Sequence, residues 1–254
     1  MKFKKVLIGM FIAGSILTLS ACGSKSASTN PKDDSSSKNS AAPRPTAKTP
    51  TLAQALKDHK FWYYFKDKKV TKDSTPSSVI VSKGNGKVAE YPWNITKAGE
   101  ENLAFSDYLK LDDKEKLSML TLPSKVVLNP YIDAYQVLNK VDNSDLFEDF
   151  KVSITTDDTG NYTKYESLTV PTLTTEKVTG GVKIEKDHSD LNIIDSSAFA
   201  TIYDHSFEGY TLVWYFSDHP QIDGSLLTET GNENIQFQLD SPKDASKHIT
   251  VDGK

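Results

Sequence analysis

The pattern of hydrophobic and polar positions divides the chain into three parts. An apolar run over 6–19 is followed by a stretch over 23–50 that contains no aromatic and no large aliphatic residue. Beyond it, apolar residues recur in short clusters that Asp, Asn, Gly and Pro residues separate. A segment without apolar side chains cannot bury a core and stays disordered. The pattern therefore predicts an apolar leader over 1–21, a disordered tether over 22–50 and a globular region over 51–254.

In the first half of the globular region, the spacing of apolar residues predicts helices. A helix is expected over 51–60, where Thr51 and Gln54 have the spacing of a capping box. Two more helices are expected over 112–122 and 129–141, the second because apolar residues recur there every three positions.

Other segments have the composition and alternation of β-strands. The aromatic run "FWYYF" at 61–65 is followed by "SSVIVSKGNGKVAEYPW", in which the turn over 83–86 predicts a hairpin. From about residue 150 onward, β-type runs follow one another, separated by turn residues. Because helices concentrate early and antiparallel strands late, we expect an α+β fold, with antiparallel β-sheets and a few short helices mainly in the N-terminal half. A subdivision near residue 145 stays open, since no linker marks it.

The leader ends at the single cysteine of the chain. Lys2, Lys4 and Lys5 precede the apolar run, and "LSAC" closes it at Cys22. A basic start, a short apolar run and small residues are typical of a secretory signal, and the run is too short to span a bilayer. The ending resembles the lipobox of bacterial lipoproteins, which implies that Cys22 carries a diacylglyceryl group and that residues 1–21 are removed. The alternative is an ordinary secretory signal with a chance cysteine.

This resemblance implies a location. Two acyl chains give stable membrane anchoring, so the protein is expected on the outer face of the cytoplasmic membrane. A flexible tether of this length reaches about 30 Å, which extends the globular region into the cell wall. Without the three lysines of the leader, 27 basic residues face 34 acidic ones, a net charge of −7. This acidic balance argues against nucleic acid as a partner.

Four aromatic residues are candidate ligand-binding residues: Trp62, Tyr64, Trp93 and Trp214. In "FWYYF", alternate rings point to opposite faces of a strand, and in "YTLVWYF" Tyr210, Leu212, Trp214 and Phe216 are expected on one face. Aromatic rings with polar tips can stack on sugars. The alternative is a packed core that covers both faces of the strands.

A search for catalytic and metal-binding patterns assigns no such residue and no cofactor. In "TTDDTGNYTKYE", Asp157, Gly160 and Glu166 have the spacing of a calcium loop, but Thr155 and Thr159 replace two ligands and the flanks alternate like strands, so a hairpin turn is favoured. The five histidines show no HExxH pattern and no close ligand spacing. Without a cysteine beyond Cys22, disulfides, cysteine nucleophiles and thiolate metal sites are excluded from the globular region.

Two segments carry a further resemblance. "WYYFKDKKVTKDSTPSSVIVSKGNGKVAEY" and "FEGYTLVWYF…NIQFQLDSPKDASKHITVD" resemble the uncharacterised surface lipoproteins of lactobacilli and related Gram-positive bacteria. The likeness covers roughly 51–95 and 195–252, together with the leader and the tether. It implies a cell-surface location and supplies no catalytic residue.

The expected function is therefore that of a lipid-anchored cell-surface protein with a non-enzymatic extracellular binding domain. A cell-wall glycan or polymer is the candidate ligand. Two alternatives stay open: an accessory subunit that docks on a membrane protein of the envelope, and an envelope hydrolase.

Overall fold

The computed structural model describes residues 48–93, 103–120, 125–126, 135–136, 143–216, 219–231 and 235–253. The expected leader, the expected lipid-attachment residue Cys22 and the tether up to residue 47 lie outside the described residues. The helices and strands are α1 (Leu52–Asp58), β1 (Phe61–Phe65), β2 (Ser78–Ser82), β3 (Lys87–Pro92), α2 (Phe105–Leu109), α3 (Asp113–Met119), β4 (Lys125–Val126), β5 (Tyr135–Gln136), η1 (Asn143–Leu146), β6 (Glu148–Asp149), β7 (Lys151–Thr156), β8 (Thr163–Val178), β9 (Gly181–Ile202), β10 (His205–Phe216), β11 (His219–Glu229), η2 (Pro242–Asp244) and β12 (Ile249–Val251).

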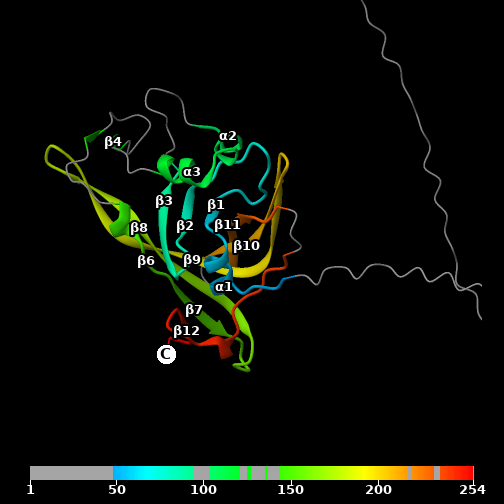
Figure 1. Cartoon of the computed structure of the whole chain (residues 1–254). Helices are drawn as coiled ribbons and strands as arrows, with labels where there is room; N and C mark the ends of the chain where they lie inside the picture. The colour runs from blue at the N-terminus through cyan, green and yellow to red at the C-terminus, as the bar shows by residue number, and fades with distance from the viewer. Residues whose placement is uncertain are drawn as a thin grey trace, which may run out of the picture. The chain divides into compact units, whose positions relative to one another are not determined.

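One large sheet dominates the structure. Its strand order is β12-β7-β8-β9-β10-β11-β1-β2-β3-β6, and β4 pairs separately with β5 (Figure 1). Neighbours in the large sheet are antiparallel except for β12, which runs parallel to β7.

The sheet closes on itself. Only Phe150 separates β6 from β7, and its backbone N–H donates to the carbonyl oxygen of Gly86 at 3.1 Å. The strand at one end of the order therefore continues directly into a strand near the other end. When β6 and β7 are counted as one strand and β12 is left out, eight strand positions form the closed sheet. A closed sheet of eight strands has an interior that side chains fill.

The expected α+β fold is wrong, because the described residues are mostly β. The helices expected over 51–60 and 112–122 form as α1 and α3, but each is only seven residues long. A strand, β5, lies within the segment 129–141 where a third helix was expected; the rest of that segment is outside the described residues. Helices this short cannot build a layer of their own, so they pack against a sheet whose strands come from both sides of residue 145.

A first hydrophobic cluster fills the interior of the closed sheet. All eight strand positions contribute buried side chains to it, among them Trp62, Ile80 and Leu226. Helix α1 joins this cluster through Leu52 and Leu56, as its apolar face predicts. The capping box is present too, since the backbone N–H of Thr51 donates to Oε1 of Gln54 at 3.2 Å.

A second hydrophobic cluster covers the outer face of β1, β2 and β3. Tyr63 packs against Phe105 of α2 with ring centroids 4.9 Å apart, and against Phe207 of β10 at 6.0 Å. Strand β1 is thus buried on both faces. The alternation predicted for "FWYYF" is confirmed, with Trp62 and Tyr64 inside and the other three rings outside.

The alternation predicted for β10 fails beyond a bulge. The register of β10 against β11 shifts between Leu212 and Val213, and both side chains are buried. Tyr210 therefore faces the interior, whereas Trp214 is 61% exposed. The extra residue lies in the partner strand β11, where Asp223 falls between the partners of Leu212 and Val213, so the sequence of β10 alone does not reveal the irregularity.

Both predicted turns are confirmed. The backbone N–H of Lys83 donates to the carbonyl oxygen of Lys87 at 2.9 Å and closes the β2–β3 hairpin. In the turn between β7 and β8, the Asp157 side chain accepts hydrogen bonds from the hydroxyl of Thr159 at 2.8 Å and from the backbone N–H of Asn161 at 3.2 Å.

Candidate functional site

The four candidate aromatic residues do not come together. Trp62 is completely buried, and Tyr64 is buried with its hydroxyl donating to Oδ2 of Asp223 at 2.7 Å. Trp93 packs on the outer face, with its ring 5.1 Å from that of Tyr108. Only Trp214 presents most of its ring to solvent. A shared aromatic platform is therefore not formed by these residues.

The structure instead has a mainly apolar cavity of about 730 Å³ beside the β2–β3 hairpin. We call it the hairpin cavity. It lies between the last turn of α1, the hairpin, helix α3 and the segment that joins η1 to β6. Its lining residues are Lys57, Asp58, Lys60, Val81, Ser82, Lys83, Gly84, Asn85, Tyr91, Leu117, Leu120 and Phe147.

The hairpin is fixed to the junction between α1 and β1. The backbone N–H of Ser82 donates to the carbonyl oxygen of Lys60 at 2.8 Å, and the Ser82 hydroxyl accepts from the N–H of Gly84 at 3.1 Å. Gly84 has a φ of +76°, which favours glycine, and a Cβ there would lie 3.4 Å from the carbonyl oxygen of Lys57. The close contact between the turn and the helix end holds one wall of the hairpin cavity in place.

Three lysines and one acid belong to the polar part of the lining. Lys60 forms an ion pair with Asp113 of α3 at 2.9 Å. The Nζ atom of Lys83 lies 3.8 Å from the ring centroid of Phe147, a cation–π contact. Lys57 lies in the last turn of α1. Among the described residues, no carboxylate is within ion-pair distance of Lys57 or Lys83.

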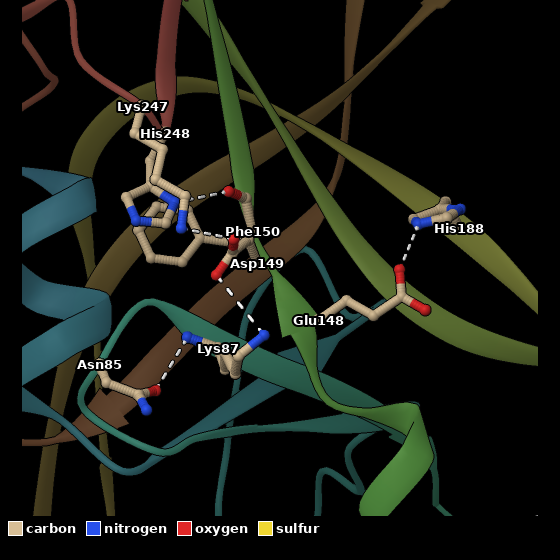
Figure 2. Close-up of polar contacts among 8 residues, drawn as sticks. All are labelled: Asn85, Lys87, Glu148, Asp149, Phe150, His188, Lys247 and His248. Carbon is tan, nitrogen blue, oxygen red and sulfur yellow. Dashed lines mark hydrogen bonds and ion pairs between the residues drawn. The ribbon is translucent and has the colours of Figure 1, made fainter.

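A charged network fastens the base of the same hairpin (Figure 2). Asp149 accepts ion pairs from Lys247 at 2.7 Å and from Lys87 at 3.8 Å. The hydrogen bond from Lys247, followed by the charges of Lys87 and His248, lowers the pKa of the Asp149 carboxyl. Because these charges satisfy one another, we assign the network a structural role at the closure of the sheet.

Two histidines lie near this network, and the charge of one of them, His248, acts on Asp149. The ring of His248 stacks on that of Phe150 at 4.7 Å, and its Nδ1 lies 3.1 Å from the Phe150 carbonyl oxygen. His188 of β9 points toward Glu148 of β6, with Nε2 3.4 Å from Oε2 (Figure 2). Each histidine thus has a local partner, and the two do not converge on a common point.

The carboxylates that do converge lie inside the closed sheet. Glu166 of β8 is completely buried and Asp240 is 1% exposed, and Oε1 of Glu166 accepts a hydrogen bond from the backbone N–H of Asp240. Oδ2 of Asp240 accepts from the N–H of Ala53 at 3.0 Å. Within the described part of the chain, Oε2 of Glu166 and Oδ1 of Asp240 have no hydrogen-bond partner.

Burial perturbs both of these acids. Desolvation raises the pKa of the Glu166 carboxyl to about 9, and the charge of Asp240 adds to the rise. Desolvation also raises the pKa of Asp240, against the opposing hydrogen bonds from Thr51 and Ala53. Without access from outside, this pair cannot act on a substrate, and Glu166 is not a ligand of the turn at Asp157.

Comparison with protein-family models, curated proteins and solved structures gave no match. The likeness to surface lipoproteins of lactobacilli therefore stays a prediction. No three His, Cys, Asp or Glu side chains in the described segments lie close enough together to hold a metal ion. The described helices are all too short or too polar to cross a membrane.

Sequence reasoning did not find the hairpin cavity. Its lining comes from four segments that the sequence separates by up to about 90 positions, from Lys57 to Phe147. The "KGNGK" turn was recognised as a hairpin, but no local pattern shows that α3 and Phe147 lie beside it.

Proposed function

We propose that the protein is a lipid-anchored cell-surface protein whose globular domain binds an apolar small molecule in the hairpin cavity, without catalysing a reaction. The observation that carries the proposal is the cavity itself. Small-molecule sites are typically mostly apolar hollows of 300–1,000 Å³ with a few polar groups. The hairpin cavity has a volume in this range, an apolar floor and a few polar groups.

The affinity this cavity supports follows from the area it can bury. A ligand that removes about 400 Å² of apolar surface from water gains about 10 kcal/mol before the costs of association. The translational and rotational freedom that the ligand loses on binding reduces this gain by several kcal/mol. We therefore expect dissociation constants in the micromolar to millimolar range, as for a surface protein that exchanges its ligand.

The location rests on the features around Cys22 and on the way the chain enters the domain. Residues 48–50 run beside 235–238, with the backbone N–H of Gln236 donating to the carbonyl oxygen of Lys48 at 2.8 Å. Residues 48–50, the last three of the tether predicted over 22–50, are thus held by the domain.

For the hairpin cavity, a binding role fits the lining side chains better than a hydrolytic one. A hydrolase needs acids, bases or nucleophiles that converge where a substrate can reach them. Asp58 is the one acid in the lining of the hairpin cavity, and no histidine belongs to that lining. Of the four aromatic residues proposed to bind a cell-wall glycan, only Trp214 has an exposed ring.

The test is saturable binding of a neutral apolar fluorophore, N-phenyl-1-naphthylamine. Residues 22–254 with Cys22→Ser are used, because all described elements lie within 48–253 and share the two clusters. Leu117 lines the cavity from the exposed surface of α3, so the larger side chain of Leu117→Trp should fill the cavity without disturbing the core. We expect this variant to bind the fluorophore at least tenfold more weakly. Lys114→Trp, on the same helix but outside the lining, is the matched control.

Two results would contradict the proposal. One is the absence of saturable fluorescence with the unsubstituted protein. The other is equal affinity in the Leu117→Trp and Lys114→Trp variants, which would place the probe elsewhere.

A further inference from the structure

The hairpin cavity has two chemically different ends. Its buried lining residues, Val81, Ser82, Tyr91 and Leu120, form a floor that is almost entirely apolar. Its exposed lining residues include all of the charged ones, so the charges lie at the opening. A ligand that matches both ends has an apolar body and a polar or charged head.

The charges at the opening favour a negative head. Three lysines stand against one acid, Asp58. Lys60 is already paired with Asp113, whereas Lys57 and Lys83 have no carboxylate partner among the residues that the structure describes. Neither ammonium group is therefore held in an ion pair within the described part of the chain, and the charge of Lys57 acts on Asp240 only from beyond ion-pair distance.

Lys83 also links the head position to the apolar part. Its ammonium lies over the ring of Phe147 at 3.8 Å, and Phe147 itself belongs to the cavity wall. An anion at Lys83 would thus have apolar surface directly beneath it for the body of the same molecule. Charge-assisted hydrogen bonds of ammonium to carboxylate are stronger than neutral ones, so the head adds both affinity and orientation.

From this arrangement, and resting on the proposed function, we infer that the ligand is an amphiphilic anion, with an acyl or similar apolar body in the hairpin cavity and one acidic head group held by Lys57 and Lys83. Small inorganic anions lack the body, and cationic amphiphiles meet like charges at the opening. A neutral amphiphile fills the floor but leaves both lysines unpaired.

The experiment displaces bound N-phenyl-1-naphthylamine with three probes of equal chain length: dodecanoate and dodecylammonium, each below its micelle concentration, and dodecanol below its solubility limit. We expect dodecanoate to bind about tenfold more tightly than dodecanol, and dodecylammonium to bind most weakly. A tenfold preference corresponds to one charge-assisted hydrogen bond of ordinary strength. Added salt should weaken dodecanoate and leave dodecanol unchanged.

Variants assign the effect to residues. Lys57→Met and Lys83→Met keep the apolar stem and remove the charge, and each is expected to weaken dodecanoate about threefold, half of the free energy of the tenfold preference, with dodecanol unchanged. Lys87→Met is the matched control, because Lys87 ends the same hairpin, pairs with Asp149 and does not line the cavity.

The outcomes separate this inference from the proposed function. Equal displacement by dodecanoate and dodecanol, with the fluorophore still bound by the cavity, would overturn the anionic head and leave the proposed function standing. The same holds if the Lys57 and Lys83 variants behave like Lys87→Met. If the fluorophore does not bind and calorimetry finds no heat with dodecanoate, both are overturned.

Discussion

Substitution of Glu166 by glutamine is expected to remove most of the dependence of stability on alkaline pH. Glu166 is completely buried, and desolvation together with the charge of Asp240 raises its pKa from 4.5 to about 9. Between these two values the folded protein keeps a proton that the unfolded chain has released. The free energy of unfolding is then largest below pH 4.5 and falls as the pH rises toward 9.

The magnitude follows from the width of that interval. Each pH unit well within it costs about 1.4 kcal/mol and the slope halves near pH 9, so the free energy of unfolding should fall by about 2 kcal/mol between pH 7 and pH 9. With a urea dependence of about 2.5 kcal/mol per molar, the unfolding midpoint should drop by about 1 M. Domains are stable by only about 5–15 kcal/mol, so a change of this size is easily measured.

The charged and titratable groups around Glu166 and Asp240 come from several elements. Tyr210 of β10 faces both acids, and burial raises its pKa so far that it stays neutral in this range. Lys57 of α1 and Asp244 of η2 act on Asp240 with opposite signs. The pH dependence is therefore expected to come mainly from Glu166.

The assay is urea unfolding followed by tryptophan fluorescence at pH 7 and pH 9. Glu166→Gln has the shape of the protonated acid, so its midpoint should hardly change between the two pH values, and at pH 9 it should exceed that of the unsubstituted protein. Glu176→Gln, on the exposed part of the same strand, is the control and should keep the full decrease. Equal pH dependence in the unsubstituted protein and Glu166→Gln would refute the reasoning.

Two further substitutions test the packing of the sheet, each by urea unfolding. Trp62→Ala should lower the free energy of unfolding by about 3–5 kcal/mol, because the ring is completely buried, whereas Trp214→Ala should change it by less than about 1 kcal/mol; similar losses would contradict the assigned faces. Gly224→Ala should lower the free energy of unfolding more than Gly160→Ala, because a Cβ at Gly224 would lie 1.9 Å from the carbonyl oxygen of Phe65. At Gly160 the surrounding space is open, so only its φ of +72° opposes alanine, at a cost of about 1–2 kcal/mol. The reverse order would show that the strands are not packed as described.

Local features were predictable because their causes lie within a few residues. The capping box at Thr51 and the turns at 83–86 and at Asp157 each depend on neighbouring side chains and on glycines with positive φ. The alternation of "FWYYF" was predictable for the same reason, since a regular strand sends successive side chains to opposite faces.

The exposure of the aromatic residues was not predictable, because it depends on partners far away in the chain. Strand β1 is buried on both faces since it pairs with β2 and β11 and lies between the interior and α2. Trp214 has a similar local sequence, but it lies beyond the register shift that Asp223 of β11 introduces, and it is exposed. The aromatic residues alternate in the same way along both strand sequences, so this pattern cannot distinguish a buried ring from an exposed one.

By itself, the sequence determined the caps and turns of the globular region; the apolar leader and the polar tether that it predicts lie outside the described residues, apart from 48–50. The tertiary structure decided that strands from both halves form one closed sheet, which overturns the expected α+β fold. It also decided that the hairpin, α1, α3 and Phe147 enclose a cavity with lysines at its opening. The physical reason is that capping and turn formation are local energies, whereas strand pairing, burial and cavity shape depend on contacts between residues far apart in the chain.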